Sequence, residues 1–130
     1  MTIFSKIIAG EIPSYKIAEN DNFYAFLDIS PLAKGHTLVV PKQEVDYIFD
    51  LEDSVYHGLL DFSKSVAIGI KAAMGCKRVG IAVIGLDVPH CHIHLVPLNN
   101  ANDINFAKKH LILNAEEMFV IAEKIRAKIL

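Results

Sequence analysis

Three histidines alternate with other residues in the segment 88–97, which reads Val-Pro-His-Cys-His-Ile-His-Leu-Val-Pro. In a β-strand successive side chains point to opposite faces, so His90, His92 and His94 are predicted to share one face. Positions two apart along a strand are separated by about 6.5–7 Å, so neighbouring imidazoles can share one small ligand. Half of the six histidines in the chain lie in this segment. This concentration on one face predicts a functional site, with the residues between the histidines in a core.

Imidazole chemistry indicates what such a site does. A neutral ring nitrogen is a nucleophile near neutral pH, and the ordinary pKa of about 6.5 also suits acid or base catalysis. Phosphoryl oxygens require charge-assisted or polar donors. The middle residue, His92, is best placed to attack phosphorus if an acceptor such as a backbone carbonyl holds its other ring nitrogen. His94 is then expected to donate to phosphoryl oxygens and His90 to orient the array.

A metal site is the main alternative. A His-x-His pair on a strand presents two nitrogens to zinc, and His36 or Asp87 is a candidate third ligand. However, no Cys-x-x-Cys accompanies the histidines, and no His-x-x-x-His lies in the longest helical segment. A polar patch without chemistry is the third interpretation. The sequence favours phosphoryl chemistry, and we expect neither a metal nor a cofactor.

Composition limits the class of protein. The 130 residues are 52% hydrophobic and 22% charged, which is typical of one soluble globular domain. The net charge is −2 and basic residues form no run longer than two, which argues against a nucleic-acid partner. Lys6 and Glu11 interrupt the apolar start, and no stretch is long enough to span a membrane. Two cysteines do not predict a disulfide framework. We expect a cytoplasmic protein with no membrane partner.

The elements that must position the histidines follow from periodicity and turn chemistry. Two turns, 20–22 and 85–87, predict hairpins, and Gly75 is the expected end of the longest helix. Asn114 with Glu117 resembles a capping box. The predicted helices are 2–9, 54–74 and one from residue 114, and the predicted strands are 15–19, 23–28, 36–41, 79–84 and the histidine segment. This order indicates an α+β fold, an antiparallel sheet with helices on one face and the histidines on the other.

The motifs resemble one known family. Residues 90–96 resemble the His-φ-His-φ-His-φ-φ signature (φ apolar) of the histidine triad (HIT) superfamily, in its Hint-like, bacterial branch. Residues 3–13 look like the N-terminal helix and turn of that family. Residues 25–31 and 35–42 look like its nucleotide-binding strand pair. The resemblance covers residues 3–97, and its motifs together are highly specific.

This resemblance implies a HIT-like fold with a five-stranded antiparallel sheet, helices packed on it, and a homodimer with a continuous ten-stranded sheet. Leu60 and Ile68, beyond the main apolar stripe of the long helix, agree with a second buried surface. The expected organisation is a single HIT domain over 1–130, with its core at 3–97 and a C-terminal helical tail at 98–130. The implied activity is hydrolysis or transfer of nucleoside 5′-monophosphate derivatives, phosphoramidates or related P–N and P–O–P compounds, as in an adenosine 5′-monophosphoramidase.

The resemblance also implies the roles of individual residues. His92 is the nucleophile that forms a nucleotidyl-histidine intermediate, His90 and His94 flank it, and His36 supports the triad. Asp28 matches the carboxylate that binds ribose hydroxyls. The remaining expected nucleotide-binding residues are the apolar walls Ile3, Phe4, Ile7, Phe26 and Ile29, together with Asp87 and Asn99. Ile3 and Ser5 occupy the region where some members carry zinc-binding cysteines, so structural zinc is not expected.

Two departures from the family pattern keep a second function class open. Leu86 stands where Gln is expected, and Asp87 stands where Ser or Thr is expected. Strand 79–84 also lacks the Asn or Gln that usually helps to hold phosphate, and an ionised Asp87 repels phosphate. We therefore expect slow turnover unless Asn99, Asn100 or a partner subunit supplies the donors. The alternative is a nucleotide-binding or interaction protein with little turnover.

Overall fold

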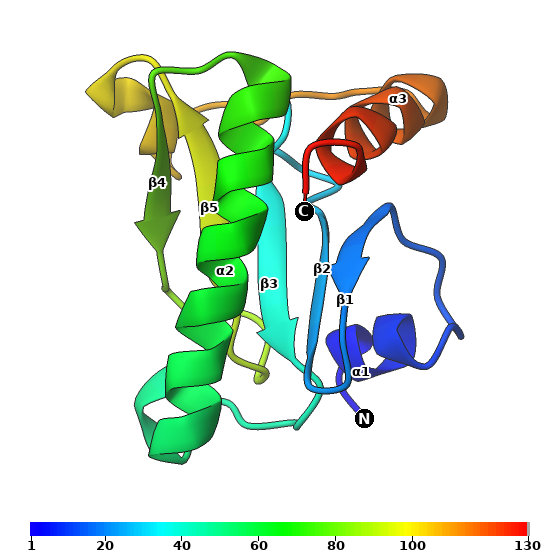
Figure 1. Cartoon of the computed structure of the whole chain (residues 1–130), viewed down its shortest axis with the longest axis vertical. Helices are drawn as coiled ribbons and strands as arrows, with labels where there is room; N and C mark the ends of the chain where they lie inside the picture. The colour runs from blue at the N-terminus through cyan, green and yellow to red at the C-terminus, as the bar shows by residue number, and fades with distance from the viewer. Residues whose placement is uncertain (130) are drawn as a thin grey trace.

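The computed structural model describes residues 1–129. The elements within this range, in chain order, are α1 (Ile3–Ile8), β1 (Lys16–Glu19), β2 (Phe23–Leu27), β3 (Thr37–Pro41), the 3-10 helix η1 (Ile48–Asp50), α2 (Asp53–Met74), β4 (Arg78–Ala82), β5 (Ile93–Leu98), the 3-10 helix η2 (Ala101–Ile104) and α3 (Ala115–Arg126). Figure 1 shows α2 running across the sheet, with α1 and α3 towards opposite ends of the molecule.

The five strands form one antiparallel sheet in the order β1-β2-β3-β5-β4. The predicted five-stranded antiparallel α+β fold is therefore confirmed. The chain reaches β5 only after α2 and β4, so the histidine segment is inserted between β3 and β4. This places it beside β3, which pairs with β2 on its other side; β2 and β3 are the two strands that the family resemblance implies bind nucleotide.

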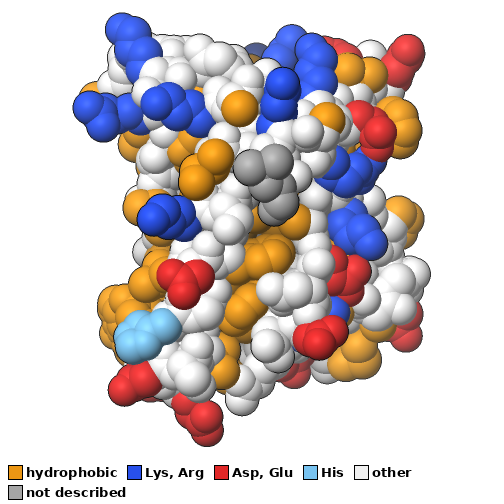
Figure 2. Space-filling view, viewed as in Figure 1, with side chains coloured by type: hydrophobic (Ala, Val, Ile, Leu, Met, Phe, Trp, Pro, Cys, Tyr) orange, Lys and Arg blue, Asp and Glu red, His pale blue; other side chains and the backbone are white. Residues whose placement is uncertain are grey.

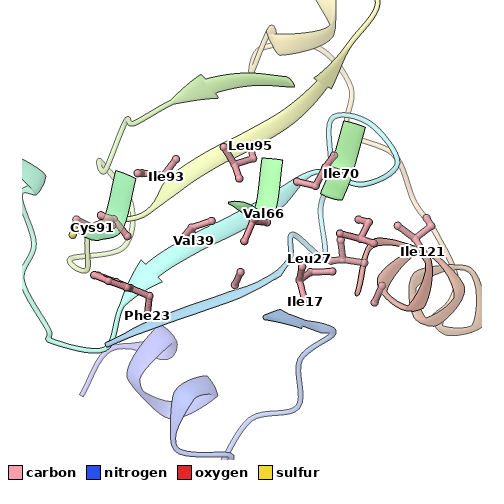
Figure 3. Close-up of a cluster of buried hydrophobic side chains, with 14 of the residues drawn as sticks. Ile17, Phe23, Leu27, Val39, Val66, Ile70, Cys91, Ile93, Leu95 and Ile121 are labelled. Atoms are coloured by element: carbon pink, nitrogen blue, oxygen red, sulfur yellow. The ribbon is translucent and has the colours of Figure 1, made fainter. Parts of the chain in front are cut away.

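Side chains alternate between the two faces of the sheet, as strand geometry requires. One face packs on α2 and α3 around a cluster that includes Cys91, Ile93 and Leu95, so the predicted inward direction of these residues is confirmed. Figure 3 shows this cluster with Val66 and Ile70 of α2. The other face packs on α1 through a second cluster: Phe4, Ile7, Tyr24, Phe26, Leu38 and Val40. The expectation of helices on one face only is wrong, because α1 covers part of the histidine face.

The helix ends follow the predicted capping chemistry. Gly75 ends α2 with a left-handed φ of 65°, a conformation that glycine adopts without a Cβ clash. The side chain of Asn114 accepts the backbone N–H of Glu117 at 2.8 Å and begins α3, so the predicted capping box is confirmed. α3 then contributes Met118, Ile121 and Ile125 to the main core. The chain beyond residue 97 therefore completes the core under β1 and α2.

The histidine segment departs from the predicted strand. β5 begins at Ile93, so His90 and His92 lie in an irregular segment before it, and the connection from β4 is far longer than a tight hairpin. Pro89 has no N–H for a strand ladder, and the N–H of Cys91 donates to the carbonyl of Val45 at 2.8 Å. The hydrogen bond to Val45 takes the place of strand pairing, and the side chains of residues 90–94 still alternate between the two faces.

The predicted ten-stranded dimer sheet would need an exposed edge, and β1 and β4 are the two edge strands. β4 is an edge strand, and its Ile81 is 55% exposed; Ile68 on α2 is 59% exposed. Leu60, in contrast, packs against the core of its own chain. Figure 2 shows hydrophobic side chains interspersed with charged ones on the α2 side of the molecule. The dimer stays a prediction. Within residues 1–129, no helix has the length and apolarity needed to cross a bilayer.

Candidate active site

A cavity of about 550 Å³ opens on the α1 side of the sheet. It lies between α1, the end of β2, the segment 84–88 and the start of β5. The predicted site residues that line it are Ile3, Phe4, Ile7, Phe26, Asp28, Ile29, Asp87, His92 and His94. Its volume and mostly apolar lining, with a few polar groups, are typical of a small-molecule site.

His92 lines this cavity, and a hydrogen bond determines which of its ring nitrogens carries the hydrogen. Its Nδ1 lies 2.8 Å from the carbonyl oxygen of His90. A carbonyl only accepts, so Nδ1 carries the hydrogen and donates it, and in the neutral ring Nε2 then holds a lone pair. The ring of Phe4 packs edge-on against His92 with 4.9 Å between centroids. This arrangement leaves Nε2 as a bare nucleophile.

His94 has the opposite tautomer, and His36 imposes it. The backbone N–H of Leu32 donates to Nδ1 of His36 at 3.0 Å, so neutral His36 carries its hydrogen on Nε2. That Nε2 lies 3.0 Å from Nδ1 of His94 and donates to it. Nδ1 of His94 is therefore an acceptor, and its Nε2 carries the hydrogen. A donor on His94 thus stands next to an acceptor on His92.

Burial keeps this pair of supporting histidines neutral. Removal from water, with a smaller contribution from positive charge on neighbouring histidines, lowers the pKa of His36 to about 3 and that of His94 to about 4. Both rings are neutral at pH 7. The tautomers assigned from their hydrogen bonds therefore apply under ordinary conditions.

His90 lies behind the cavity and does not line it. Its side chain is fully buried, with Nε2 2.7 Å from the carbonyl oxygen of Pro41 and Nδ1 2.8 Å from Oγ1 of Thr2. Burial lowers the pKa of His90. With both ring nitrogens occupied, His90 can act on the reaction only through its neighbours. This geometry agrees with the orienting role expected for it.

Asp28 follows directly after β2 and offers an acceptor to the cavity. Its Oδ1 accepts the N–H of Ser30 at 2.8 Å, and its Oδ2 lies 3.6 Å from Nε2 of His36. Burial raises the pKa of Asp28, against the lowering effect of the Ser30 hydrogen bond. A carboxylate oxygen that faces a cavity can accept hydrogen bonds from a vicinal diol. Ile29, largely exposed, lies at the rim beside it.

The metal alternative has a candidate cluster, but its hydrogen bonds disfavour it. Side-chain atoms of Asp28, His36 and His94 lie within 4.8 Å of one another. A histidine that binds a metal through one nitrogen normally donates a hydrogen bond through the other. Nδ1 of His36 instead accepts the N–H of Leu32, so its Nε2 must keep its hydrogen. The donor set therefore suits proton transfer better than metal ligation.

Asn99 does not belong to this cavity, contrary to expectation. It follows β5, about 16 Å along the chain from His94 at strand spacing, and lines a separate cavity with Lys34 and Glu117. Its side-chain oxygen accepts the N–H of Lys77 at 3.0 Å. Asn100 caps η2. Neither Asn99 nor Asn100 of the same chain therefore supplies the hydrogen-bond donors that Leu86 and Asp87 lack.

Two residues that the sequence analysis missed close the cavity from the segment after η2. Phe106 packs edge-on against His94, with 4.8 Å between centroids. His110 places Nδ1 2.6 Å from the carbonyl of Ser30 and Nε2 3.3 Å from that of Phe106, and the Ser30 bond raises the pKa of His110. Residues 105–114 form neither a helix nor a strand, so no hydrophobic periodicity in the sequence indicated that Phe106 and His110 face the cavity. An aromatic residue and a histidine in a long connection were the available signal.

The buried histidines predict an acid-sensitive fold. The folded pKa of His36 and that of His94 lie below the unfolded value of about 6.5, so the unfolded chain binds more protons as the pH falls. The free energy of unfolding should therefore decrease from about pH 6.5 downward, towards pH 4. Urea denaturation at several pH values measures this slope. His36→Asn should flatten it, whereas substitution of His57, exposed on α2, should not; equal slopes in both variants would contradict the account.

Comparison with known proteins agrees with this geometry. The chain matches the HIT domain family over residues 9–101. It is 34% identical over 130 residues to an adenosine 5′-monophosphoramidase of Schizosaccharomyces pombe, covering 98% of this chain and 97% of that protein. It is 36% identical over 96 residues to an adenosine 5′-monophosphoramidase of Saccharomyces cerevisiae, covering 73% of this chain and 61% of that protein.

Solved structures show the same relationship. A Hit-like protein from Bartonella henselae, described as involved in cell-cycle regulation, superposes with a TM-score of 0.85 at 30% identity, covering 98% of this chain and 95% of that one. The family match spans more than half of the chain and contains β2, β3 and β5 with all three histidines of the motif. This chain belongs to the HIT domain family.

Proposed function

We propose that this protein hydrolyses nucleoside 5′-monophosphate derivatives, phosphoramidates first, through a nucleotidyl intermediate on Nε2 of His92. The observation that carries the proposal is the hydrogen bond from Nδ1 of His92 to the carbonyl of His90, which leaves Nε2 bare beside the donor on His94. The two relatives described as adenosine 5′-monophosphoramidases support the choice of substrate class.

The substrate binds with its base among apolar side chains and its ribose at Asp28. The apolar residues of the cavity wall are Ile3, Phe4, Ile7, Phe26 and Ile29. Asp28 accepts from the ribose hydroxyls through the oxygen that Ser30 leaves unused. Because His92 and His94 line the same cavity, the 5′-phosphoryl group then lies against them.

In the first step, Nε2 of His92 attacks phosphorus, a P–N(His) bond forms, and the bond from phosphorus to the leaving amine breaks. The ring becomes cationic because Nδ1 keeps its hydrogen, and the carbonyl of His90 stabilises that charge. His94 donates its Nε2 hydrogen bond to a phosphoryl oxygen. The departing nitrogen takes the electron pair of the broken bond and one proton from solvent water, and leaves as the neutral amine.

In the second step, water attacks phosphorus and the P–N(His) bond breaks. The attacking water releases one proton to solvent, which balances the proton taken up by the amine, the electron pair returns to Nε2, and His92 is neutral again. The products are the nucleoside monophosphate and the amine, so one water is consumed in each cycle. The proposal uses no metal and no cofactor, since the neutral histidines themselves supply the nucleophile and the donor.

A second candidate function is nucleotide binding with little turnover. Asp87 lines the cavity, and Leu86, 87% exposed, has no donor to offer a leaving group. General acid assistance is typically worth 10²–10⁴-fold, so its loss slows the first step. Release of AMP from adenosine 5′-phosphoramidate separates the two functions: sustained release identifies an enzyme, and AMP binding without release identifies a binding protein.

We further propose that two copies pair through the β4 edges to form a ten-stranded sheet. An exposed edge strand with unpaired backbone groups is a template for such pairing. The exposed Ile81 on β4 agrees with a buried position in the pair.

His92→Asn should abolish turnover while leaving AMP affinity nearly unchanged. Removal of a nucleophile costs several orders of magnitude in kcat, whereas the base and ribose contacts remain. AMP release from the phosphoramidate measures turnover, and calorimetry measures AMP affinity. His57→Asn, on the surface of α2, is the matched control and should behave as wild type. Near wild-type turnover in His92→Asn would refute the assigned nucleophile.

Asp28→Ala should weaken AMP binding by roughly 1.5–3 kcal/mol, the range for hydrogen bonds to a charged group. The 2′,3′-dideoxy analogue of AMP provides the matching change on the ligand. If the carboxylate binds the ribose hydroxyls, wild type should bind the analogue more weakly by a similar amount, and Asp28→Ala should not distinguish the two ligands. Equal affinity of wild type for AMP and the analogue would contradict the ribose contact.

A further inference from the structure

The N-terminal end of α1 contacts the histidine motif through a side chain. Thr2 is the N-cap residue of α1, and its Oγ1 accepts the backbone N–H of Ser5 at 3.1 Å. The same Oγ1 lies 2.8 Å from Nδ1 of His90. One hydroxyl therefore caps a helix and contacts the residue whose carbonyl holds His92.

The direction of the Thr2–His90 hydrogen bond follows from the other side of the ring. Nε2 of His90 lies 2.7 Å from the carbonyl oxygen of Pro41, which can only accept, so Nε2 carries the hydrogen. Neutral His90 then has a bare Nδ1, and the single hydroxyl hydrogen of Thr2 donates to it. Without that donor, a fully buried ring nitrogen would lose its partner.

Glu44 holds Thr2 in place. Its Oε1 accepts the backbone N–H of Thr2 and, at 2.8 Å, the hydroxyl of Ser5. Ser5 thus donates its hydrogen to Glu44. The Thr2 hydroxyl has two acceptors within reach, Nδ1 of His90 at 2.8 Å and Oγ of Ser5 at 3.3 Å, and the shorter contact is the one to His90. These hydrogen bonds lower the pKa of Glu44. Glu44 lies three residues after Pro41, so the chain that leaves β3 supports His90 on both sides.

We propose that Thr2, anchored by Glu44, is a positioning residue for the triad. Its hydroxyl donates to the bare Nδ1 of His90 and so holds the ring between Pro41 and α1. The fixed His90 carbonyl then keeps the hydrogen of His92 on Nδ1. α1 also carries Phe4, which packs edge-on against both rings. The same contact therefore aligns the nucleophile with the apolar wall of the substrate cavity.

This inference rests on the proposed function only where turnover is concerned. Displacement of a reacting group by about 1 Å can cost 10²-fold in rate, so loss of the Thr2 hydroxyl should lower kcat about 10–100-fold. AMP affinity should change by less than about threefold, because Asp28 and most of the apolar wall remain. A general loss of structure would instead lower AMP affinity together with kcat.

The experiment compares Thr2→Val, which keeps the shape and loses the donor, with Thr2→Ser, which keeps the donor. Nitrogen-15 spectra of ring-labelled histidine report the tautomers of His90 and His92, and the hydrogen bonds to their ring nitrogens, without any substrate. We expect Thr2→Ser to retain wild-type spectra and kcat. We expect Thr2→Val to shift the Nδ1 signal of His90, because that nitrogen loses its hydrogen-bond donor, and to show the stated drop in kcat. Wild-type spectra in Thr2→Val would overturn the proposal, even if the wild-type protein shows no turnover.

Glu44→Ala tests the anchor without removing a helix cap. Glu44 is exposed, so this variant should fold even if Thr2→Val does not. It should shift the His90 signals in the same direction as Thr2→Val. Gln43→Ala, at the exposed neighbouring position, is the control and should change nothing. His90 signals identical in Glu44→Ala and Gln43→Ala would overturn the role of the anchor.

Discussion

The hydrogen bond from Nδ1 of His92 to the carbonyl of His90 is the interaction on which the site depends. It determines which ring nitrogen carries the hydrogen, and so whether Nε2 can act as a nucleophile. A second line of hydrogen bonds, from the N–H of Leu32 through His36 to His94, sets the opposite tautomer there. An acceptor and a donor then face one cavity. The His94 tautomer requires neutral His36 and His94 rings, and burial of both side chains keeps them neutral.

The fold serves this arrangement by covering both faces of three adjacent strands. β2, β3 and β5 pack on α2 and α3 on one side. On the other side β2 and β3 pack on α1 and His94 of β5 packs on Phe106, and His36 and His90 are removed from water. Removal from water makes the charged imidazolium costly and holds the neutral form. The free energy that offsets the burial of these polar rings comes from the hydrophobic core, to which the C-terminal helix α3 contributes. The side of the sheet that carries the histidines therefore depends on packing on its opposite side.

The sequence was most informative for features that neighbouring residues determine, such as the direction of strand side chains and the ends of helices. Period-two alternation placed Cys91, Ile93 and Leu95 in the core, and capping chemistry located the start of α3 at Asn114. It could not reveal that the strand begins only at Ile93, because the alternation continues through a segment whose partner is the Val45 carbonyl. Phe106 reaches the site through a long irregular connection, and such a tertiary contact leaves no periodic signal.

The central claim is that catalysis proceeds through Nε2 of His92. Its most direct test is to mix the protein with adenosine 5′-phosphoramidate, stop the first turnover in base and identify the nucleotidylated histidine. N-phosphoryl bonds survive in base, and the two ring isomers differ in their phosphorus and proton spectra. The account predicts AMP on Nε2 of His92. Label on Nδ1 or on another histidine, or turnover with no label during the first cycle, would contradict it.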